Sequence, residues 1–272
     1  MTALIIFIFG LVIGSFLNVC IYRMPKGESI IRPRSYCPCC KRAIFWYDNI
    51  PLLSYVILKG RCRFCKEKIS FRYFIVELLT AGLLLFLFKH YGLGFNFIFY
   101  SLFCCGLIIA TFVDIQHRII PDEISLGGIF VGFILNIFKG IFLHSSLPPK
   151  DSFLGIFVGA GIIYLTGKTF DFFYFRLLKK PPIEGETESL GFGDVKFLAM
   201  IGSFLGWQNA LLTFFVAPVI GTIFGLISLF LTKRHTIPYG PFLSLGAFIS
   251  MLWGKTIIDF ISLEYGFSGF SF

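Results

Sequence analysis

The sequence predicts an all-α polytopic membrane protein of about eight transmembrane helices, with a small cysteine-rich loop domain after the first helix. Three observations lead to this fold class. Hydrophobic residues make up 56% of the 272-residue chain and charged residues only 14%, a composition too apolar for an ordinary soluble domain. Apolar runs close to the roughly 20 residues that cross a bilayer recur along the chain. Half of the 24 lysines and arginines fall within residues 23–72, as expected for one large cytoplasmic loop.

The first predicted helix covers residues 3–22 and has no charge before Arg23. Because it lacks a basic N-terminal region, we expect a spanning helix and no cleaved signal peptide. Ser15, Asn18 and Tyr22 recur on one side at helical spacing. Two interpretations stay open: these polar residues join two helices, or they form a polar lining that faces a bound ligand.

The cysteines of residues 23–70 predict a zinc-ribbon-like domain. Cys37 with Cys40 and Cys62 with Cys65 form two C-x2-C pairs, and four thiolates at such spacing bind Zn²⁺ as a tetrahedron. Disulfides are disfavoured in a cytoplasmic loop, and four thiolates leave no open position for catalysis by the metal. Cys39 is a spare thiol that competes with Cys40 as the fourth ligand.

Seven further helices are expected after this domain, with a polar loop over residues 171–190 that carries Glu184, Glu186 and Glu188. Glu77 lies inside the second helix, where a carboxylate is costly unless it is paired or functional. Asp122 follows a proline and is interpreted as a helix N-cap. The expected helices cover residues 71–88, 95–113, 123–143, 152–170, 194–205, 209–231 and 242–261.

Eight spans place both termini on one side, and the basic residues support the direction. Twenty lysines and arginines fall on the side of the cysteine loop and four on the other, which predicts termini outside and the loop inside. The net charge of +9 therefore reflects membrane topology, and no nucleic-acid partner is expected. We divide the chain into a first transmembrane helix (1–22), a cytoplasmic cysteine-rich domain (23–70) and a membrane-embedded domain (71–272).

Two aspartates at the cytoplasmic edge are the candidate catalytic residues. Asp114 ends the third helix, and Asp194 follows Gly191-Phe192-Gly193 where a polar loop meets an apolar helix. Each has a structural alternative: an i,i+4 contact with Arg118, or an N-cap. The two glycines favour a functional role for Asp194, because a bare cap needs no such backbone freedom. Two facing aspartates share a proton and activate water, as in an aspartyl protease.

A set of short motifs recurs along nearly the whole chain: residues 14–19, 23–25, 37–40, 46–51, 60–65, 72–73 with Glu77, Asp114 with 119–122, 191–196 and 240–243. In these motifs the chain resembles the type IV prepilin peptidases, the bifunctional leader peptidases and N-methyltransferases of pilus and type II secretion systems. At one position it departs from the family, with Tyr73-Phe74 where Tyr-Pro is usual.

The resemblance implies cleavage of a short basic leader from pilin-like (prepilin or pseudoprepilin) substrates at the cytoplasmic face of the bacterial inner membrane. The new N-terminal residue is then N-methylated with S-adenosylmethionine. Asp114 and Asp194 match the family's catalytic aspartates, and the four paired cysteines match its structural zinc ligands. Gly60 matches a glycine tied to methyl transfer. Gly191, Gly193 and Lys196 form the active-site loop, while Ser15, Asn18 and Glu77 are a possible polar lining.

Two alternatives remain at this point. In the first, the protein is a peptidase only, and the zinc loop docks the substrate. In the second, it is a non-enzymatic zinc-ribbon scaffold in the membrane, and both aspartates are helix caps.

Overall fold

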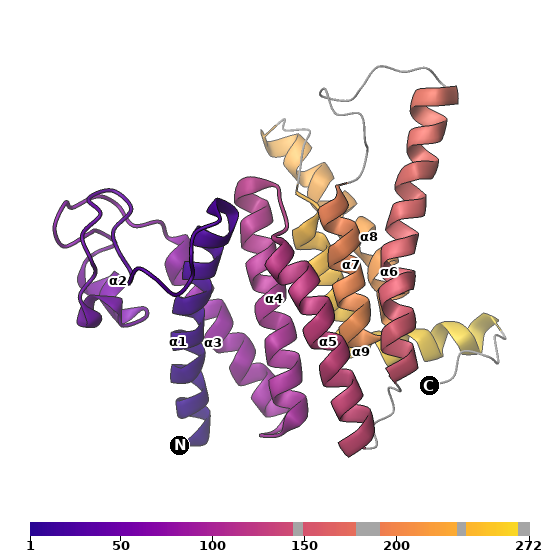
Figure 1. Cartoon of the computed structure of the whole chain (residues 1–272), viewed down its shortest axis with the longest axis horizontal. Coiled ribbons are helices and arrows are strands. Elements are labelled where there is room, and N and C mark those ends of the chain that lie inside the picture. Colours follow the sequence, from indigo (N-terminus) through magenta and orange to yellow (C-terminus); the bar gives the residue numbers. More distant parts are fainter. Residues whose placement is uncertain (144–148, 178–190, 233–237, 266–272) are drawn as a thin grey trace. The chain divides into compact units, whose positions relative to one another are not determined.

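The computed structural model describes residues 1–143, 149–177, 191–232 and 238–265, and the regular elements within them are helical. The extended pairings in these residues are two isolated bridges, Tyr36 with Ala43 and Arg61 with Lys68. The predicted all-α class is therefore confirmed. The helices labelled in Figure 1 are α1 (Thr2–Arg23), α2 (Leu53–Ile57), α3 (Arg72–Tyr91), α4 (Phe95–His117), α5 (Asp122–Leu143), α6 (Pro149–Asp171), α7 (Phe192–Leu205), α8 (Trp207–Thr232) and α9 (Gly240–Tyr265).

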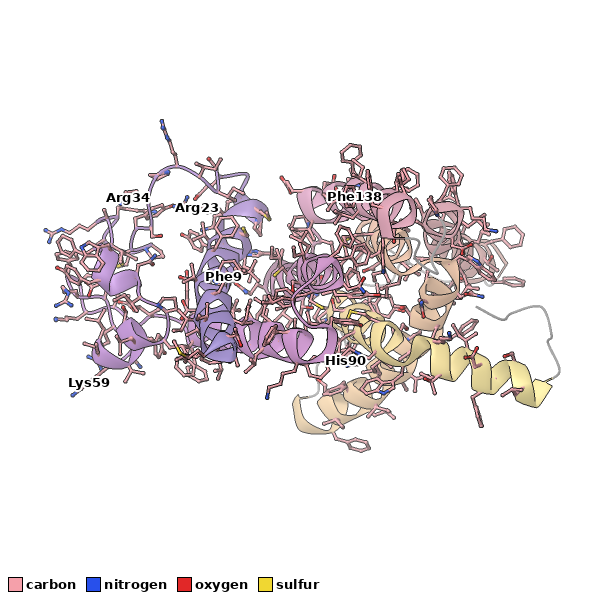
Figure 2. The ribbon with its side chains drawn as sticks, turned by 90° about the horizontal axis from the view of Figure 1, so that it is seen from below. Phe9, Arg23, Arg34, Lys59, His90 and Phe138 are labelled. Carbon is pink, nitrogen blue, oxygen red and sulfur yellow. The ribbon has the colours of Figure 1, made fainter. Side chains whose placement is uncertain are left out.

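Seven helices within the described residues are long and apolar enough to cross a membrane: α1, α3, α4, α5, α6, α8 and α9. The remaining one of the eight expected helices, predicted over residues 194–205, is α7. It has 14 residues, and at 1.5 Å per residue it is about 21 Å long, less than the hydrocarbon thickness of a bilayer. Large apolar side chains such as Phe9 and Phe138 are exposed to 54% and 44% (Figure 2). Such surfaces are typical of helices that face lipid.

Contacts between Cα atoms divide the chain into two units, Met1–Val113 and Asp114–Phe272. In the first unit, α1 packs against α3 (Figure 1). An added Cβ at Gly10 would lie 2.6 Å from the Cα of Ala81, and one at Gly14 would lie 2.7 Å from the Cα of Glu77. These glycines therefore let the two backbones approach closely, as small residues do between membrane helices.

Residues 24–71, which we call the cysteine-rich segment, connect α1 to α3 and contain α2. Arg23, buried at the end of α1, organises the start of this segment. Its guanidinium donates to the carbonyls of Ser29 (3.0 Å) and Arg34 (3.3 Å) and lies over the ring of Tyr36, 5.3 Å from its centroid. A buried arginine is thus paired with carbonyl dipoles and an aromatic face, which offset part of the cost of its burial.

In the second unit, α7 lies between α5 and α6 (Figure 1) and also contacts α8 and α9. Its residues from Phe197 to Leu205 are buried. The carbonyl of Ser203 accepts hydrogen bonds from Asn136 of α5 (2.7 Å) and Ser152 of α6 (2.5 Å). The short helix is therefore the core around which the longer ones pack.

Residues 171–177, expected as the start of a loop over residues 171–190, are helical. After α6 the chain continues as a π-helix over Phe172–Leu177, because the aromatic run Phe170–Phe175 lacks the helix breakers that would end the helix at residue 170. The glutamates predicted for this loop, Glu184, Glu186 and Glu188, lie outside the described residues.

The closest backbone approach of α6 and α7 gives a stability prediction. Gly155 and Gly202 face each other, and a Cβ added to either would overlap the carbonyl oxygen of the other. We expect Gly155→Ala to destabilise the protein by about 1–3 kcal/mol through overpacking, seen as a lower thermal unfolding temperature in detergent. Gly161→Ala is the matched control, since a Cβ there meets no atom within 4 Å. Equal stability of the two variants would contradict this packing.

Candidate active site and metal centre

Asp114 lies in the last turn of α4, and its carboxylate is held by the start of α9. The residue is only 6% exposed, and its Oδ2 accepts a hydrogen bond of 2.8 Å from the backbone amide of Gly240. A Cβ added to Gly240 would lie 2.8 Å from the same oxygen, so that only glycine fits at this position. The first amide of a helix carries positive partial charge and suits a carboxylate acceptor.

Asp194 lies in the first turn of α7, which begins at Phe192 with Gly191 as its N-cap. The expected helix start at Asp194 is therefore two residues late, and no side chain caps this helix. Among the residues that the structure describes, the Asp194 carboxylate accepts no hydrogen bond, and the charge of Asp114 acts on it. The structure thus brings together the two acids that the sequence separates by 80 residues.

Two contacts hold the first turn of α7 against the chain that follows Asp114. A Cβ added to Gly193 would lie 3.4 Å from the Cβ of Ile120, so the turn passes close to this loop. The ammonium of Lys196 donates to Oδ1 of Asp122 at 2.7 Å. Asp122, expected as an N-cap, is instead the first residue of α5 and the ion-pair partner of Lys196.

Tyr239, which directly precedes α9, adds a phenol to this site. Burial and, second, the charge of Asp194 raise the pKa of Tyr239 to about 12. The hydroxyl therefore stays protonated near neutral pH and keeps the capacity to donate a hydrogen bond. Neither Tyr239 nor the contact between Gly240 and Asp114 was predicted from the sequence. The sequence signal that could have indicated them is the turn at residues 238–241, which contains a glycine and two prolines directly before an apolar run.

Two carboxylates at the ends of helices are suited to general acid–base catalysis. Two carboxylates whose charges act on each other do not both ionise easily, and such a pair is able to share one proton. The ionised member accepts a proton from water, and the protonated member donates one to a carbonyl oxygen. The arrangement at Asp114 and Asp194 therefore suits hydrolysis of an amide without a covalent intermediate.

The four paired cysteines, Cys37, Cys40, Cys62 and Cys65, lie together in the cysteine-rich segment. Their sulfur atoms are all within 4.8 Å of one another, and the sulfurs of Cys37 and Cys65 are 3.8 Å apart. Two thiolates at about 2.3 Å from a tetrahedral Zn²⁺ are separated by about 3.8 Å. The residues therefore fit a structural zinc ion, which would crosslink the two halves of the segment.

The two cysteine pairs have the same backbone shape. The amide of Cys37 donates to the carbonyl of Arg42 and that of Cys62 to the carbonyl of Glu67, both at 2.9 Å. Lys41 and Lys66, which follow each pair, both take positive φ, 58° and 59°. A hydrogen bond from the backbone amide of Cys65 lowers the pKa of the Cys62 thiol to about 7, which favours the thiolate that zinc requires.

The possible polar lining divides into two hydrogen-bonded contacts within the first unit. Glu77 accepts hydrogen bonds from the backbone amide of Leu52 (2.8 Å) and from Ser15. Asn18 donates to the carbonyl of Tyr73 at 3.0 Å, while its own carbonyl oxygen is buried without a partner. These contacts support the helix-joining interpretation, and they also tie the cysteine-rich segment to α3. The ligand-lining role stays a prediction.

Gly60 lies between α2 and the second cysteine pair, with φ of +65°. An added Cβ would lie 3.0 Å from the ring and hydroxyl of Tyr55. The position therefore requires glycine on two counts, backbone conformation and close packing.

Two protein-family models match the chain: the bacterial peptidase A24 N-terminal domain over residues 8–91, and the type IV leader peptidase family over residues 101–226. A protein of Aeromonas salmonicida named prepilin leader peptidase/N-methyltransferase is 32% identical over 281 residues, which cover 93% of this chain and 91% of that protein. The chain belongs to the type IV leader peptidase family. Proteins with the same name from Legionella pneumophila and Pseudomonas aeruginosa are 32% and 34% identical, over 94% and 91% of this chain and 93% and 89% of theirs. No solved structure matches the chain.

The metal site gives a prediction that separates Cys40 from the spare Cys39. The sulfur of Cys40 belongs to the four-cysteine cluster, whereas Cys39 is exposed and outside it. We expect Cys40→Ser to lose most of the zinc that the purified protein carries, because a ligand is removed, and Cys39→Ser to keep it. Elemental analysis of zinc per chain makes the measurement. Zinc lost from Cys39→Ser but kept in Cys40→Ser would reverse the assignment.

Proposed function

We propose that this family member removes the short basic leader from pilin-like precursors and then methylates the new N-terminal residue. The observation that carries the proposal is the electrostatic interaction of Asp114, in the last turn of α4, with Asp194, in the first turn of α7. The names of its relatives, prepilin leader peptidase/N-methyltransferase, support this substrate class and both reactions. Pilin and pseudopilin precursors in the membrane are the expected partners.

In the proposed mechanism, one aspartate takes a proton from water as the water oxygen attacks the scissile carbonyl. The other aspartate, protonated, donates to the carbonyl oxygen, and the tetrahedral intermediate then collapses with protonation of the leaving amine. The hydrogen bond from Gly240 orients the Asp114 carboxylate, and the ion pair of Lys196 with Asp122 keeps the first turn of α7 in place. Such positioning lowers the barrier because the reacting groups need not be ordered during the reaction.

The cysteine-rich segment is assigned to the methyl-transfer reaction, with S-adenosylmethionine as the methyl donor. Zinc would keep the segment folded, since residues 24–71 are too few and too basic to form a core of their own. Gly60, whose close contact with Tyr55 joins α2 to the second cysteine pair, is the residue assigned to this activity. The location of basic residues supports termini outside and both sites at the cytoplasmic face of the inner membrane.

Substitution of the proposed catalytic acids tests the peptidase. We expect Asp194→Asn and Asp114→Asn each to reduce leader cleavage by at least about 100-fold, because the amide keeps the shape but neither accepts nor supplies the proton. Cleavage of a pilin precursor by purified protein in detergent makes the measurement. Asp151→Asn is the control, an acid in the first turn of α6. If Asp194→Asn still cleaves at the wild-type rate, the catalytic acids lie elsewhere, with Asp122 and Glu77 as the next candidates.

Mass measurement of the mature pilin N-terminus tests the second reaction. With added S-adenosylmethionine we expect the product to gain about 14 Da, one methyl group. The Asp194→Asn variant, given a pilin whose leader has already been removed, should still add the methyl group, because the two reactions use different parts of the chain. An unmethylated product from the zinc-loaded wild type would instead favour a peptidase whose zinc loop docks the substrate.

A further inference from the structure

The cysteine-rich segment contains a basic cavity that has no assigned role in either proposed reaction. The cavity has a volume of about 320 Å³ and is lined by Leu58, Lys59, Arg61, Cys62, Arg63 and Lys66. Four of these six residues are cationic, and the volume is within the range of small-ligand sites. The whole segment, residues 24–71, has ten lysines and arginines against three acids, a net charge of +7. The cavity is therefore suited to an anion.

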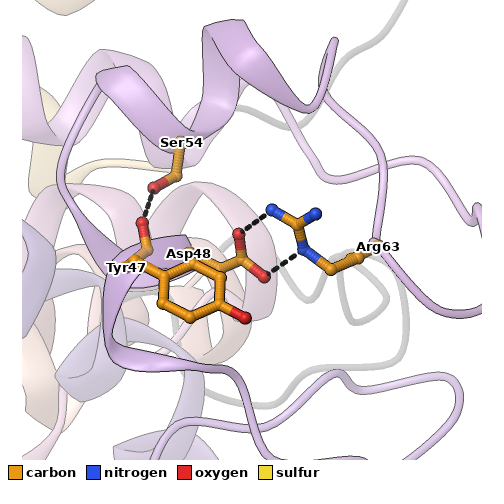
Figure 3. A network of polar contacts seen from close by, with 4 residues as sticks. All are labelled: Tyr47, Asp48, Ser54 and Arg63. Atoms are coloured by element: carbon orange, nitrogen blue, oxygen red, sulfur yellow. Dashed lines mark hydrogen bonds and ion pairs between the residues drawn. The ribbon is translucent and has the colours of Figure 1, made fainter.

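Arg63, one of the four cationic residues, is paired with an acid, and its side chain is held in a fixed position in the cavity lining. Arg63 donates from Nε and a terminal nitrogen to both oxygens of Asp48, at 2.7 and 2.6 Å (Figure 3). Its guanidinium lies 5.5 Å from the ring centroid of Tyr47. In the part of the chain that the structure describes, Lys59, Arg61 and Lys66 form no ion pair with an acid. Three uncompensated positive charges therefore remain.

An exposed apolar surface lies directly before the cavity in the chain. Leu53, Val56 and Ile57 of α2 are spaced i, i+3 and i+4, so they share one face of the helix, and they are 52%, 63% and 63% exposed. The opposite side of α2 packs on α3, since the ring of Tyr55 lies 5.7 Å from that of Phe74. The helix therefore turns a purely apolar face away from α3.

Contacts with α3 place this surface at the depth of the membrane boundary. Glu77, which accepts from the Leu52 amide at 2.8 Å, is five residues after the first residue of α3, or about 7.5 Å along the helix axis. Since α3 is one of the membrane-spanning helices, Leu52 and the start of α2 lie beside its second turn. At this depth a protein surface meets phospholipid headgroups and the upper part of the acyl chains.

We propose that the cavity and the apolar face of α2 together bind an anionic phospholipid. Lys59, Arg61 and Lys66 contact the phosphate of the headgroup, and Leu53, Val56 and Ile57 contact the acyl chains. Lysine and arginine are the usual ligands of phosphate. The lipid would hold the cysteine-rich segment, to which we assign the methyl-transfer reaction, on the membrane surface.

The test compares two triple variants of the full-length protein that lose the same charge. One is Lys59→Gln/Arg61→Gln/Lys66→Gln. The control is Lys26→Gln/Arg32→Gln/Arg34→Gln, from the same segment but outside the cavity; Arg34 and Lys59 lie at opposite ends of the segment in Figure 2. Binding of phosphatidylglycerol and phosphatidylcholine is measured by native mass spectrometry in detergent. Zinc content and thermal unfolding check that the variants fold.

We expect wild type to bind phosphatidylglycerol at least about tenfold more tightly than phosphatidylcholine, and the cavity variant to lose most of this preference. A basic residue near an anionic lipid contributes roughly fivefold in affinity. The control variant should lose less than about threefold. Equal losses in the two variants would overturn the site, because the attraction would then come from the whole segment. Binding of inorganic phosphate as tight as that of the lipid would also overturn it and indicate a soluble phosphate-bearing ligand.

A second measurement needs no substitution in the cavity and decides the question if the cavity variant does not fold. Trp46, which is 77% exposed, neighbours Tyr47 with ring centroids 5.7 Å apart and so reports on this region. In a Trp207→Phe/Trp253→Phe background, brominated phosphatidylglycerol should quench its fluorescence more strongly than brominated phosphatidylcholine at equal mole fraction. Equal quenching by the two lipids would overturn the proposal.

Discussion

The hydrogen bond from the Gly240 amide to Asp114 is the interaction on which the candidate active site depends. It joins the end of α4 to the start of α9 around a buried carboxylate, and a buried charge needs such a partner. The contact of Gly193 with Ile120 and the ion pair of Lys196 with Asp122 then place the start of α7 beside the same acid. Three helix ends thus meet at the two carboxylates. Two carboxylates can lie at the boundary of an apolar helix bundle here because the contacts between the helix ends are made by a backbone amide, a glycine and an ion pair.

The cysteine-rich segment follows a different principle, since few of its residues are buried. It is held by discrete polar and aromatic contacts: Arg23 at its start, the bidentate pair of Arg63 with Asp48 in its middle, and Glu77 on the amide of Leu52. The four-cysteine cluster adds the crosslink that a metal ion would complete. A segment built in this way is exposed on most of its surface, which leaves basic and apolar side chains available to the membrane next to it.

Much of the candidate site was predictable from the residues themselves. The C-x2-C spacing identified the four clustered cysteines, and the two glycines before Asp194 indicated a carboxylate in an unusual setting. The sequence left open whether Cys39 or Cys40 completes the cluster, and the geometry selects Cys40. Asp122 was interpreted as a helix cap, but its partner, Lys196, is 74 residues away. A short-range pattern such as Pro-Asp before a helix favours the local partner and carries no information on distant ones.

The sequence by itself determined the membrane class, the approximate bounds of the helices and the presence of two cysteine pairs at metal-binding spacing, because these depend on hydrophobic length and on spacing between near neighbours. Only the tertiary structure decided that Asp114 meets the amide of Gly240 and that the short α7 is the buried centre of its unit, although it is the helix least suited to cross a bilayer alone. It also decided that Glu77 binds the backbone of the cysteine-rich segment. The physical reason is the same in each case: a buried polar group has to find a partner, and the chain supplies that partner through packing of distant helices.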